Sequence, residues 1–375
     1  HFRIQTLRVP RDMRKHIDAA PATPKGATLT FTTLKEDDTP QTYVVAPDGD
    51  DRNSGLTRRN AWRTVQHAAN EVNVGDTVLL AGGTYAERVR IRVTGTTDAP
   101  ITFKAMQGEK VTMSGAGKKL NSAFIVNVKH HLRFDGFYFH EHSRAELQGW
   151  PLKLSGEFSL YRSSDIHITR CFSEGRGGYS ARTVNAWHVS NLLIRNCVTL
   201  NKMSGAMRFV RCPDLQVEHT VFCRPMISAF LLRNNKDQKV TMTNNIFTDM
   251  LLKKAKRNIP LFTVDYRLRC PELWNNCFYL RCFPPEKRAI VRDRTAADLN
   301  AYMKNTLFAD PQFAGDSTAE DVFGPDHMMH PRLDLDFDDF FATNPTLKKR
   351  RIGLERKAFK TFHFNSAADG NTGGR

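Results

Sequence analysis

The chain has 375 residues, 40% of them hydrophobic, which is enough to bury a sizeable core. It contains no run of eighteen apolar residues, so the sequence predicts no membrane-spanning helix. The formal net charge of +16 favours an anionic partner, such as an acidic polysaccharide, a nucleic acid or an anionic cell surface.

Residues 1–41 are basic and then rich in Pro and Thr, and they show little periodicity. We interpret them as an N-terminal arm or extension, which would be suited to reach a neighbouring molecule in an assembly. The first residues lack the apolar core of a signal peptide. Either a leader has been removed or there was none. With removal as the working expectation, the protein is expected to be secreted, periplasmic or on the cell surface.

Residues 42–293 change in character, because short β-branched segments alternate with Gly, Asp and Pro turns. One amphipathic helix is predicted over residues 60–72, with Trp62, Val65, Ala69 and Val72 on one face and Asn60 as the N-cap. Short strands are then expected in 74–85, 87–91, 100–105 and 111–115.

A short motif recurs between Ile166 and Asn276. Aligning its members as one column gives steps of 26, 23, 26 and 31 residues, and the aligned residues are Cys171, Cys197, Thr220, Ile246 and Cys277. Such a period is typical of the stacked coils of a solenoid with loops of varying length. Asn196, Asn245 and Asn276 precede the column and predict partial amide ladders, interrupted by Arg170 and His219.

A second set of strands accompanies this motif, and alternation along a strand assigns the sides. The inward column is predicted to be Val126, Leu160, Ala186, Phe209, Leu232 and Val264. The outward columns are Ile125, Ser159, Asn185, Arg208, Leu231 and Thr263, and then Asn127, Tyr161, Trp187, Val210, Arg233 and Asp265.

Residues 294–375 form the last predicted part of the chain. A helix capped by Thr295 is expected over 295–305, followed by Phe308–Phe313, Asp338–Phe341, a basic run at Lys348–Arg351 and a Gly-rich tail. The basic run and the tail are interpreted as solvated surface.

The opening of the β-rich part resembles a known superfamily. Tyr43–Asp51, Ala61–Ala69, Gly75–Val78, Gly83–Glu87 and Ala99–Ala105 resemble the start of right-handed parallel β-helix proteins of the pectate-lyase-like superfamily, of polysaccharide lyase or glycoside hydrolase type. The resemblance implies an all-β, single-stranded right-handed parallel β-helix. It also implies that the helix caps the open end and that the "Asp-Pro-x-Phe" and "Asp-Phe" segments close the C-terminal end.

The resemblance further implies that an acidic polysaccharide lies in a groove along one sheet. The residues that we predict to be catalytic are Arg208, Arg233, Asp265 and Lys202. Those predicted to bind substrate are Tyr161, Trp187, Asn185, His188, Arg182, Lys153 and Arg211, with Arg162 nearby. Arginine forks would neutralise a uronate carboxylate, and Lys202, Lys153 or Tyr161 would act as the base of a β-elimination.

Two alternatives stay open. A glycoside hydrolase would pair Asp265 with Glu174, Asp249 or Glu157, whereas a noncatalytic β-helix would bind glycan or form an assembly. The Asn-Gly-Glu and Lys-Ser signatures of alginate and chondroitin lyases are absent, as is the Gly-His-Gly of polygalacturonases. Calcium stays open as a cofactor but is not supported by a ligand motif, and no metal-binding residue is predicted. Nucleic acid is not expected, because the basic residues are spread over the chain and no recognition module is visible.

The seven cysteines show no metal-binding spacing, and those in the repeat column are predicted to be small apolar residues inside turns. A disulfide that involves Cys212, Cys223, Cys270 or Cys282 remains open at this point.

Overall fold

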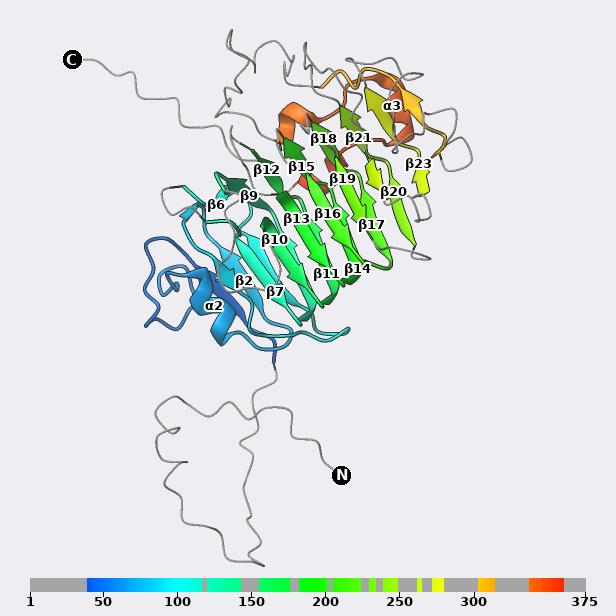
Figure 1. Ribbon diagram of the computed structural model, residues 1–375. Helices are drawn as coiled ribbons and strands as arrows, with labels where there is room; N and C mark the ends of the chain where they lie inside the picture. Colours follow the sequence, from blue (N-terminus) through cyan, green and yellow to red (C-terminus); the bar gives the residue numbers. More distant parts are fainter. Residues whose placement is uncertain are drawn as a thin grey trace, which may run out of the picture. The chain divides into compact units, whose positions relative to one another are not determined.

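The computed structural model describes a β-helix that begins at Thr39. The described residues are 39–116, 120–142, 155–175, 182–200, 202, 205–223, 229–233, 239–248, 262–264, 272–279, 303–313 and 337–360, of which 262–264 are described by their backbone alone. Consecutive coils stack their strands into three parallel sheets, as Figure 1 shows. Residues at equivalent positions of successive coils therefore lie beside one another.

The three sheets, here named A, B and C, contain only parallel pairs of strands. Sheet A consists of β1 (Thr42–Val45), β2 (Thr77–Leu80), β5 (Ile101–Ala105), β8 (His130–Asp135), β11 (Ser164–Thr169), β14 (Ser190–Arg195), β17 (Leu215–Glu218), β20 (Val240–Thr243), β23 (Glu272–Trp274) and β25 (Met303–Lys304). Sheet B consists of β3 (Gly83–Tyr85), β6 (Val111–Ser114), β9 (Phe137–His140), β12 (Phe172–Glu174), β15 (Val198–Leu200), β18 (Val221–Cys223), β21 (Ile246–Thr248), β24 (Cys277–Tyr279) and β26 (Leu307–Phe308). Sheet C consists of β4 (Val89–Arg90), β7 (Phe124–Asn127), β10 (Gly156–Tyr161), β13 (Arg182–Trp187), β16 (Met207–Val210), β19 (Phe230–Arg233) and β22 (Phe262–Val264).

The sheet C register agrees with the predicted columns. Leu160 pairs with Val126 and Ala186, and the column continues through Phe209 and Leu232. The inward side chains are buried and pack with phenylalanines from the other sheets into one core. The two outward columns are also in the predicted register as far as Arg233, whereas Asp265 lies outside the described residues.

The Cys column is displaced by one residue in its last two coils. Val221 pairs with Ile246, and Ile246 pairs with Cys277, so the residues aligned with Thr220 are Asn245 and Asn276. Asn245 and Asn276 therefore point inward, where each amide replaces a cysteine or threonine of the preceding coils. They can do so because their polar atoms are paired: Asn276 Oδ1 accepts from Asn245 N at 2.9 Å, and Asn276 Nδ2 donates to Met242 O at 2.9 Å.

The amide ladder therefore contains different residues from those predicted. It runs from Cys197 through Thr220 and Asn245 to Asn276, because each backbone N–H donates to the side chain of the next coil. Asn196 does not belong to it. It lies one position earlier, in the left-handed conformation that Arg170 and His219 share.

The capping helix α2 (Val65–Glu71) is shorter than predicted. Thr64, not Asn60, is the N-cap, and its hydroxyl accepts from His67 N at 3.1 Å. Trp62 lies before the helix, where its backbone forms a parallel bridge with Val45. The predicted apolar face is nevertheless buried, so the interpretation of the helix as an end cap holds.

The described cysteines are free thiols. Cys171, Cys197 and Cys277 are buried and form no disulfide, which agrees with their interpretation as small apolar residues. Cys212 and Cys223, for which a disulfide had been left open, are buried free thiols as well. Cys270 and Cys282 lie outside the described residues.

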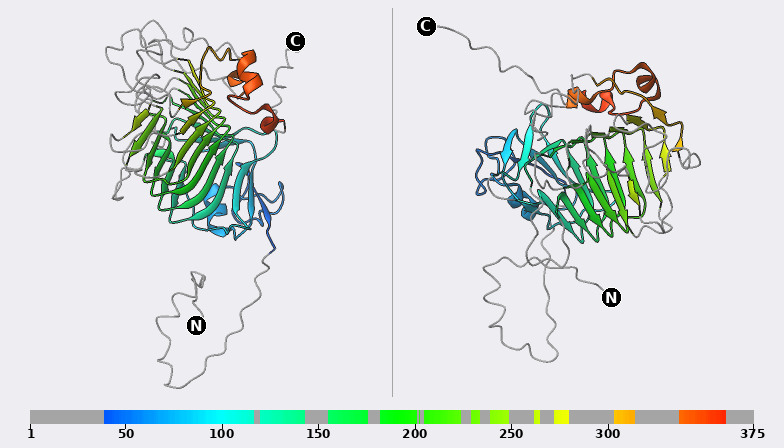
Figure 2. Two further views of the ribbon diagram at one scale, coloured as in Figure 1. Left: turned by 90° about the vertical axis from the view of Figure 1, so that its right-hand side faces the viewer. Right: turned by 45° about the horizontal axis from the view of Figure 1, so that its top comes forward.

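The C-terminal segment, residues 337–360, lies across the turns that join sheet A to sheet B (Figure 2). It contains η3 (Phe337–Phe340), α3 (Pro345–Arg350) and η4 (Arg356–Phe359). Phe337 packs on Tyr138 and Phe172 of sheet B, so the segment runs back along the coils and does not only close the last one. Of the helix predicted at 295–305, Met303–Lys304 is a strand instead, and residues 295–302 lie outside the described part.

Gly353 shows how closely this segment fits. Its φ is +92°, and a Cβ there would lie 2.7 Å from Ile246 Cδ1. Only glycine combines this conformation with so close an approach. Its N–H donates to Asn244 O at 2.7 Å and its carbonyl meets His219 Nδ1 at 3.0 Å, which fixes the segment to two coils.

Candidate functional site

The turn between sheets C and A repeats one conformation in successive coils. Arg162, His188 and Arg211 each follow a sheet C strand directly, with φ of 45°, 55° and 53°. Their N–H groups donate to the backbone of the next coil, Arg162 N to Trp187 O at 2.9 Å and His188 N to Val210 O at 2.8 Å. Identical turns stack at about the strand spacing of 4.8 Å, so the three side chains stand in line.

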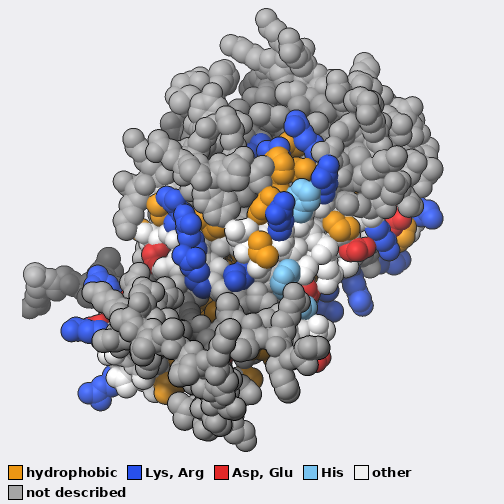
Figure 3. All heavy atoms as spheres, turned by 60° about the horizontal axis from the view of Figure 1, so that its bottom comes forward, with side chains coloured by type: hydrophobic (Ala, Val, Ile, Leu, Met, Phe, Trp, Pro, Cys, Tyr) orange, Lys and Arg blue, Asp and Glu red, His pale blue; other side chains and the backbone are white. Residues whose placement is uncertain are grey.

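These turn residues join the outward side chains of sheet C to form one surface, which we call the ridge. The ridge consists of Tyr161, Arg162, Trp187, His188, Arg208, Arg211 and Arg233. The arginine at 208 lies 4.5 Å from the Trp187 ring centroid, and Arg162 lies 5.2 Å from that of Tyr161. Figure 3 shows Lys and Arg side chains gathered on one face of the molecule, with hydrophobic and His side chains between them.

Three arginines of the ridge have no acidic partner among the described residues. In the described part of the chain, no carboxylate lies within 4.0 Å of the guanidinium of Arg162, Arg211 or Arg233, and all three side chains are exposed. Burial together with the positive charges of Arg211 and Arg162 lowers the pKa of His188. His188 is therefore an unprotonated imidazole at neutral pH, flanked by two cations.

Trp187 is held in place by a buried amide. Its Nε1 donates to Asn185 Oδ1 at 3.1 Å, and Asn185 Nδ2 donates to Ser155 O at 3.4 Å. The prediction that Asn185 is exposed in the groove is wrong, because its side chain is fully buried. It points outward from sheet C, but its contacts orient the indole and are not available to a ligand.

The prediction that Lys202 is a catalytic residue near the groove is also wrong. Lys202 is 1% exposed, and its Nζ donates to Glu157 Oε1 at 2.7 Å. Ser173 donates to the other oxygen of Glu157, and Thr183 donates to Ser173 at 2.9 Å. An ammonium group enclosed in this way is not presented to a polymer, so Lys202 is a structural residue of the corner between sheets B and C.

Arg182 and His142 also lie in the interior. Arg182, predicted to bind substrate, is 8% exposed. His142 is 3% exposed, and within the described residues neither of its ring nitrogens has a hydrogen-bond partner. Burial, Lys202 and His140 lower the pKa of His142 to about 3, so it is neutral. No sequence pattern indicates His142, because an isolated histidine after a strand belongs to no recognisable motif.

The carboxylate pair of a hydrolase is not assembled by the described residues. Glu157 is committed to Lys202, and burial, opposed by Lys202 and Ser173, raises its pKa. Glu174 is buried as well. Asp265, Asp249 and Lys153 lie outside the described residues, so their predicted roles stay predictions.

The described residues contain neither a metal-binding cluster nor a membrane-spanning helix. Among them, no three His, Cys, Asp or Glu side chains are grouped so as to hold a metal ion. No helix in these ranges has the length and apolarity needed to cross a membrane.

Comparison with known proteins finds similarity in the first half of the β-helix. The model of the Chondroitinase B family matches residues 60–203, although the lyase signatures sought in the sequence are absent. The uncharacterized protein YwoF of Bacillus subtilis (strain 168) is 32% identical over 130 residues, 33% of this chain and 28% of that protein. Pectate lyase PEL9 of Emericella nidulans is 37% identical over 73 residues, 19% of this chain and 18% of that protein. The matches thus span less than a third of these relatives.

Among solved structures, that of pectate lyase Pel9A has a TM-score of 0.49 at 12% identity, covering 79% of this chain and 90% of that one. The region that matches the family model includes the capping helix and strands of all three parallel sheets. The chain folds as a right-handed parallel β-helix, and over residues 60–203 it is similar to the Chondroitinase B family.

Proposed function

We propose that the ridge binds an acidic, uronate-containing polysaccharide and that the protein cleaves it by β-elimination. The observation that carries the proposal is the column of Arg162, His188 and Arg211, in which two exposed arginines without acidic partners among the described residues flank a histidine whose pKa is lowered. Buried or paired arginines stabilise a fold, whereas a row of exposed ones without partners suits a polyanion.

Five ridge residues have a task in this reaction. The rings of Tyr161 and Trp187 present apolar faces to sugar rings, and the guanidinium groups of Arg211 and Arg233 bind carboxylates. Neutralising the uronate carboxylate acidifies the proton on the adjacent carbon, and it stabilises the negative charge that develops as this proton leaves.

The elimination then needs a base and a proton donor. His188 accepts the proton, the electron pair of the broken C–H bond forms the carbon–carbon double bond, and the glycosidic oxygen leaves with the electrons of its bond. The Tyr161 hydroxyl supplies the proton to that oxygen. The rings of Tyr161 and His188 are in edge-to-face contact, 6.3 Å apart between centroids, so one sugar unit lying across them can contact both. His188 takes the role first assigned to Lys202, because Lys202 is buried.

The test is incubation with alginate, pectate, glycosaminoglycan and sulfated polysaccharides, followed by the absorbance of unsaturated uronate. We expect new absorbance on at least one uronate polymer. It should be lost in Arg233→Ala and in His188→Asn but retained in the matched control Arg59→Ala, which removes an exposed arginine near the capping helix.

Other outcomes would contradict the elimination. Reducing ends without new absorbance would identify a hydrolase. Binding without cleavage on every polymer would support a noncatalytic glycan-binding β-helix. An unchanged rate in Arg233→Ala would remove that residue from the site.

A further inference from the structure

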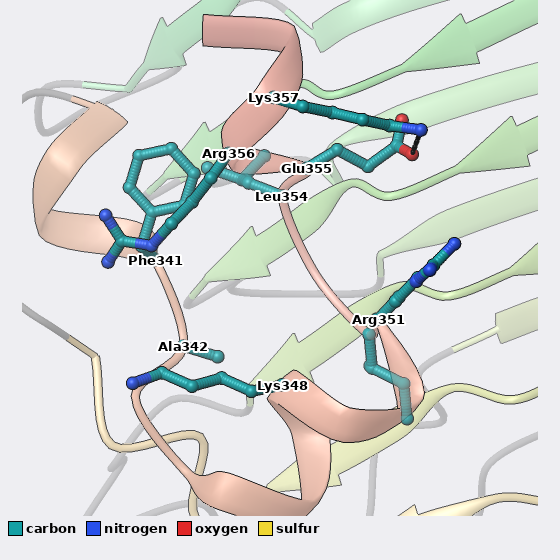
Figure 4. Close-up of a pocket in the computed structure, with 9 residues that line it drawn as sticks. Phe341, Ala342, Lys348, Arg351, Leu354, Glu355, Arg356 and Lys357 are labelled. Atoms are coloured by element: carbon teal, nitrogen blue, oxygen red, sulfur yellow. Dashed lines mark ion pairs between the residues drawn. The ribbon is translucent and has the colours of Figure 1, made fainter. Parts of the chain in front are cut away.

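The C-terminal segment lines a pocket that is separate from the ridge. The pocket has a volume of about 570 Å³, and its lining residues are Phe341, Ala342, Lys348, Arg351, Ile352, Leu354, Glu355, Arg356 and Lys357 (Figure 4). This volume lies within the roughly 300–1,000 Å³ that is usual for small-molecule sites. All of these residues belong to the described part of the chain.

Four cations surround the pocket. Lys348 belongs to α3, Arg351 is its left-handed C-cap, and Arg356 and Lys357 belong to η4. In Figure 4, Lys348 and Arg356 extend toward one side of the pocket, and Arg351 and Lys357 toward the other. Arg356 lies 4.4 Å from the centroid of the Phe341 ring, which fixes its guanidinium at the rim.

The single carboxylate of the pocket does not balance this charge. Glu355 Oε2 accepts from Arg195 Nη2 at 2.7 Å, and Lys357 Nζ lies 3.7 Å from Oε1. Burial would raise the pKa of Glu355, but the hydrogen bond from Arg195 and the charge of His219 lower it. Glu355 thus serves as an ionised anchor between the segment and the β-helix, and the pocket keeps a surplus of positive charge.

The floor of the pocket is apolar. Phe341, Ala342, Ile352 and Leu354 are each 8% exposed or less. A compact apolar floor inside a cationic rim suits a ligand that has a C–H face and anionic substituents around its edge. A sugar ring that carries carboxylate or sulfate groups has this form, and an inorganic anion uses only the rim.

The pocket and the ridge lie at opposite ends of sheet A strands. His188 precedes β14 and Arg195 ends it, and the six residues of β14 span roughly 20 Å at about 3.3 Å per residue. A short oligosaccharide at one site therefore does not reach across to the other.

We propose that this pocket is a second binding site for an acidic saccharide unit, separate from the ridge. The class of ligand rests on the proposed function of the ridge. Two sites on one body hold a long polymer more strongly than either alone, because the second contact is intramolecular once the first has formed.

The test is calorimetric titration of the full chain with trigalacturonate, trimannuronate and a sulfated chondroitin tetrasaccharide, and separately with inorganic sulfate. The pocket variant is Lys348→Gln with Arg356→Gln. The matched control is Lys349→Gln with Lys360→Gln, which removes the same charge from exposed neighbours outside the pocket. The ridge variant is Arg211→Gln with Arg233→Gln.

We expect at least one oligosaccharide to bind the wild type and the control at two sites. The pocket variant should weaken one of them at least tenfold, and the ridge variant should weaken the other. Pocket binding that persists in a protein that cleaves nothing would support the second site while refuting the lyase. Identical titrations of pocket variant and control, or sulfate binding as tight as that of every sugar, would overturn the proposal.

Discussion

Two groups of arginines use the same stacked coils in different ways. On sheet A and its turns toward sheet B, Arg133 donates to Asp165 at 2.8 Å, Arg170 pairs with Asp135, and Arg195 pairs with Glu355. On the ridge, Arg162, Arg211 and Arg233 have no carboxylate partner among the described residues. Because a paired arginine satisfies a carboxylate of its own chain, the first group stabilises the fold. The second group is the one that we propose to bind a ligand.

The largest expected effect concerns the most deeply buried pair. Lys202→Met leaves the carboxylate of Glu157 buried without its cation, which should lower the free energy of unfolding by about 3–5 kcal/mol. Urea unfolding measures the loss. The double variant Glu157→Gln with Lys202→Met removes both charges and should recover much of it. A wild-type unfolding midpoint for Lys202→Met would show that the pair is not enclosed.

A smaller loss is expected at Asp165 in the paired group. Asp165→Asn keeps a residue that tolerates its left-handed φ of 50°, but it removes the charge that accepts from Arg133 and His131. The cost should be about 1–3 kcal/mol in urea unfolding at neutral pH.

The effect of Asp165 should also depend on pH. Burial would raise the pKa of Asp165, but Arg133 and His131 lower it below its usual value of 3.8. A carboxyl group with a lowered pKa in the folded state stabilises above its unfolded value, and that stability is lost as the pH falls through the folded value. The difference between wild type and Asp165→Asn should therefore shrink below about pH 4. A difference that stays constant down to acid unfolding would contradict the assigned ion pair.

The ridge arginines should contribute little to stability. Arg162→Gln and Arg211→Gln should each change the free energy of unfolding by less than about 0.5 kcal/mol, because surface residues without partners rarely contribute more. Binding of an acidic oligosaccharide should fall at least tenfold in the same variants. Strong destabilisation by either substitution would place these arginines in the paired group instead.

The smallest expected effect is a shift in a pH profile. Because Arg211 is one of the groups that lower the pKa of His188, Arg211→Gln should raise it. If unprotonated His188 is the base, the acid limb of the kcat/KM profile moves to higher pH in this variant. Arg59→Gln serves as the control, and an acid limb that does not move would remove His188 from the role of base.

The sequence predicts the direction of side chains better than their exposure. Alternation along sheet C correctly placed Leu160 inward and Asn185 outward, and adjacent coils confirmed the register. Yet Asn185 and Lys202 are buried. A period of two assigns the side of the sheet, whereas burial depends on neighbours that are distant in the sequence, such as Glu157 for Lys202.

The predicted register is wrong where two asparagines are adjacent in the sequence. In Asn244–Asn245 and Asn275–Asn276, either asparagine can occupy the left-handed turn position. The first one does so, and the second points inward because the backbone of adjacent coils satisfies its amide. Composition alone cannot distinguish the two. The ridge arginines were predicted, but the paired and unpaired groups became distinct only when distances could be measured.

The most direct test of the account is the initial rate of unsaturated uronate formation by Arg211→Gln, compared with wild type and with Arg59→Gln on the same polymer. The account predicts that Arg59→Gln matches wild type, whereas Arg211→Gln is at least tenfold slower with an unchanged unfolding midpoint. Equal rates in all three proteins would contradict the claim that the unpaired arginines of the ridge hold the substrate.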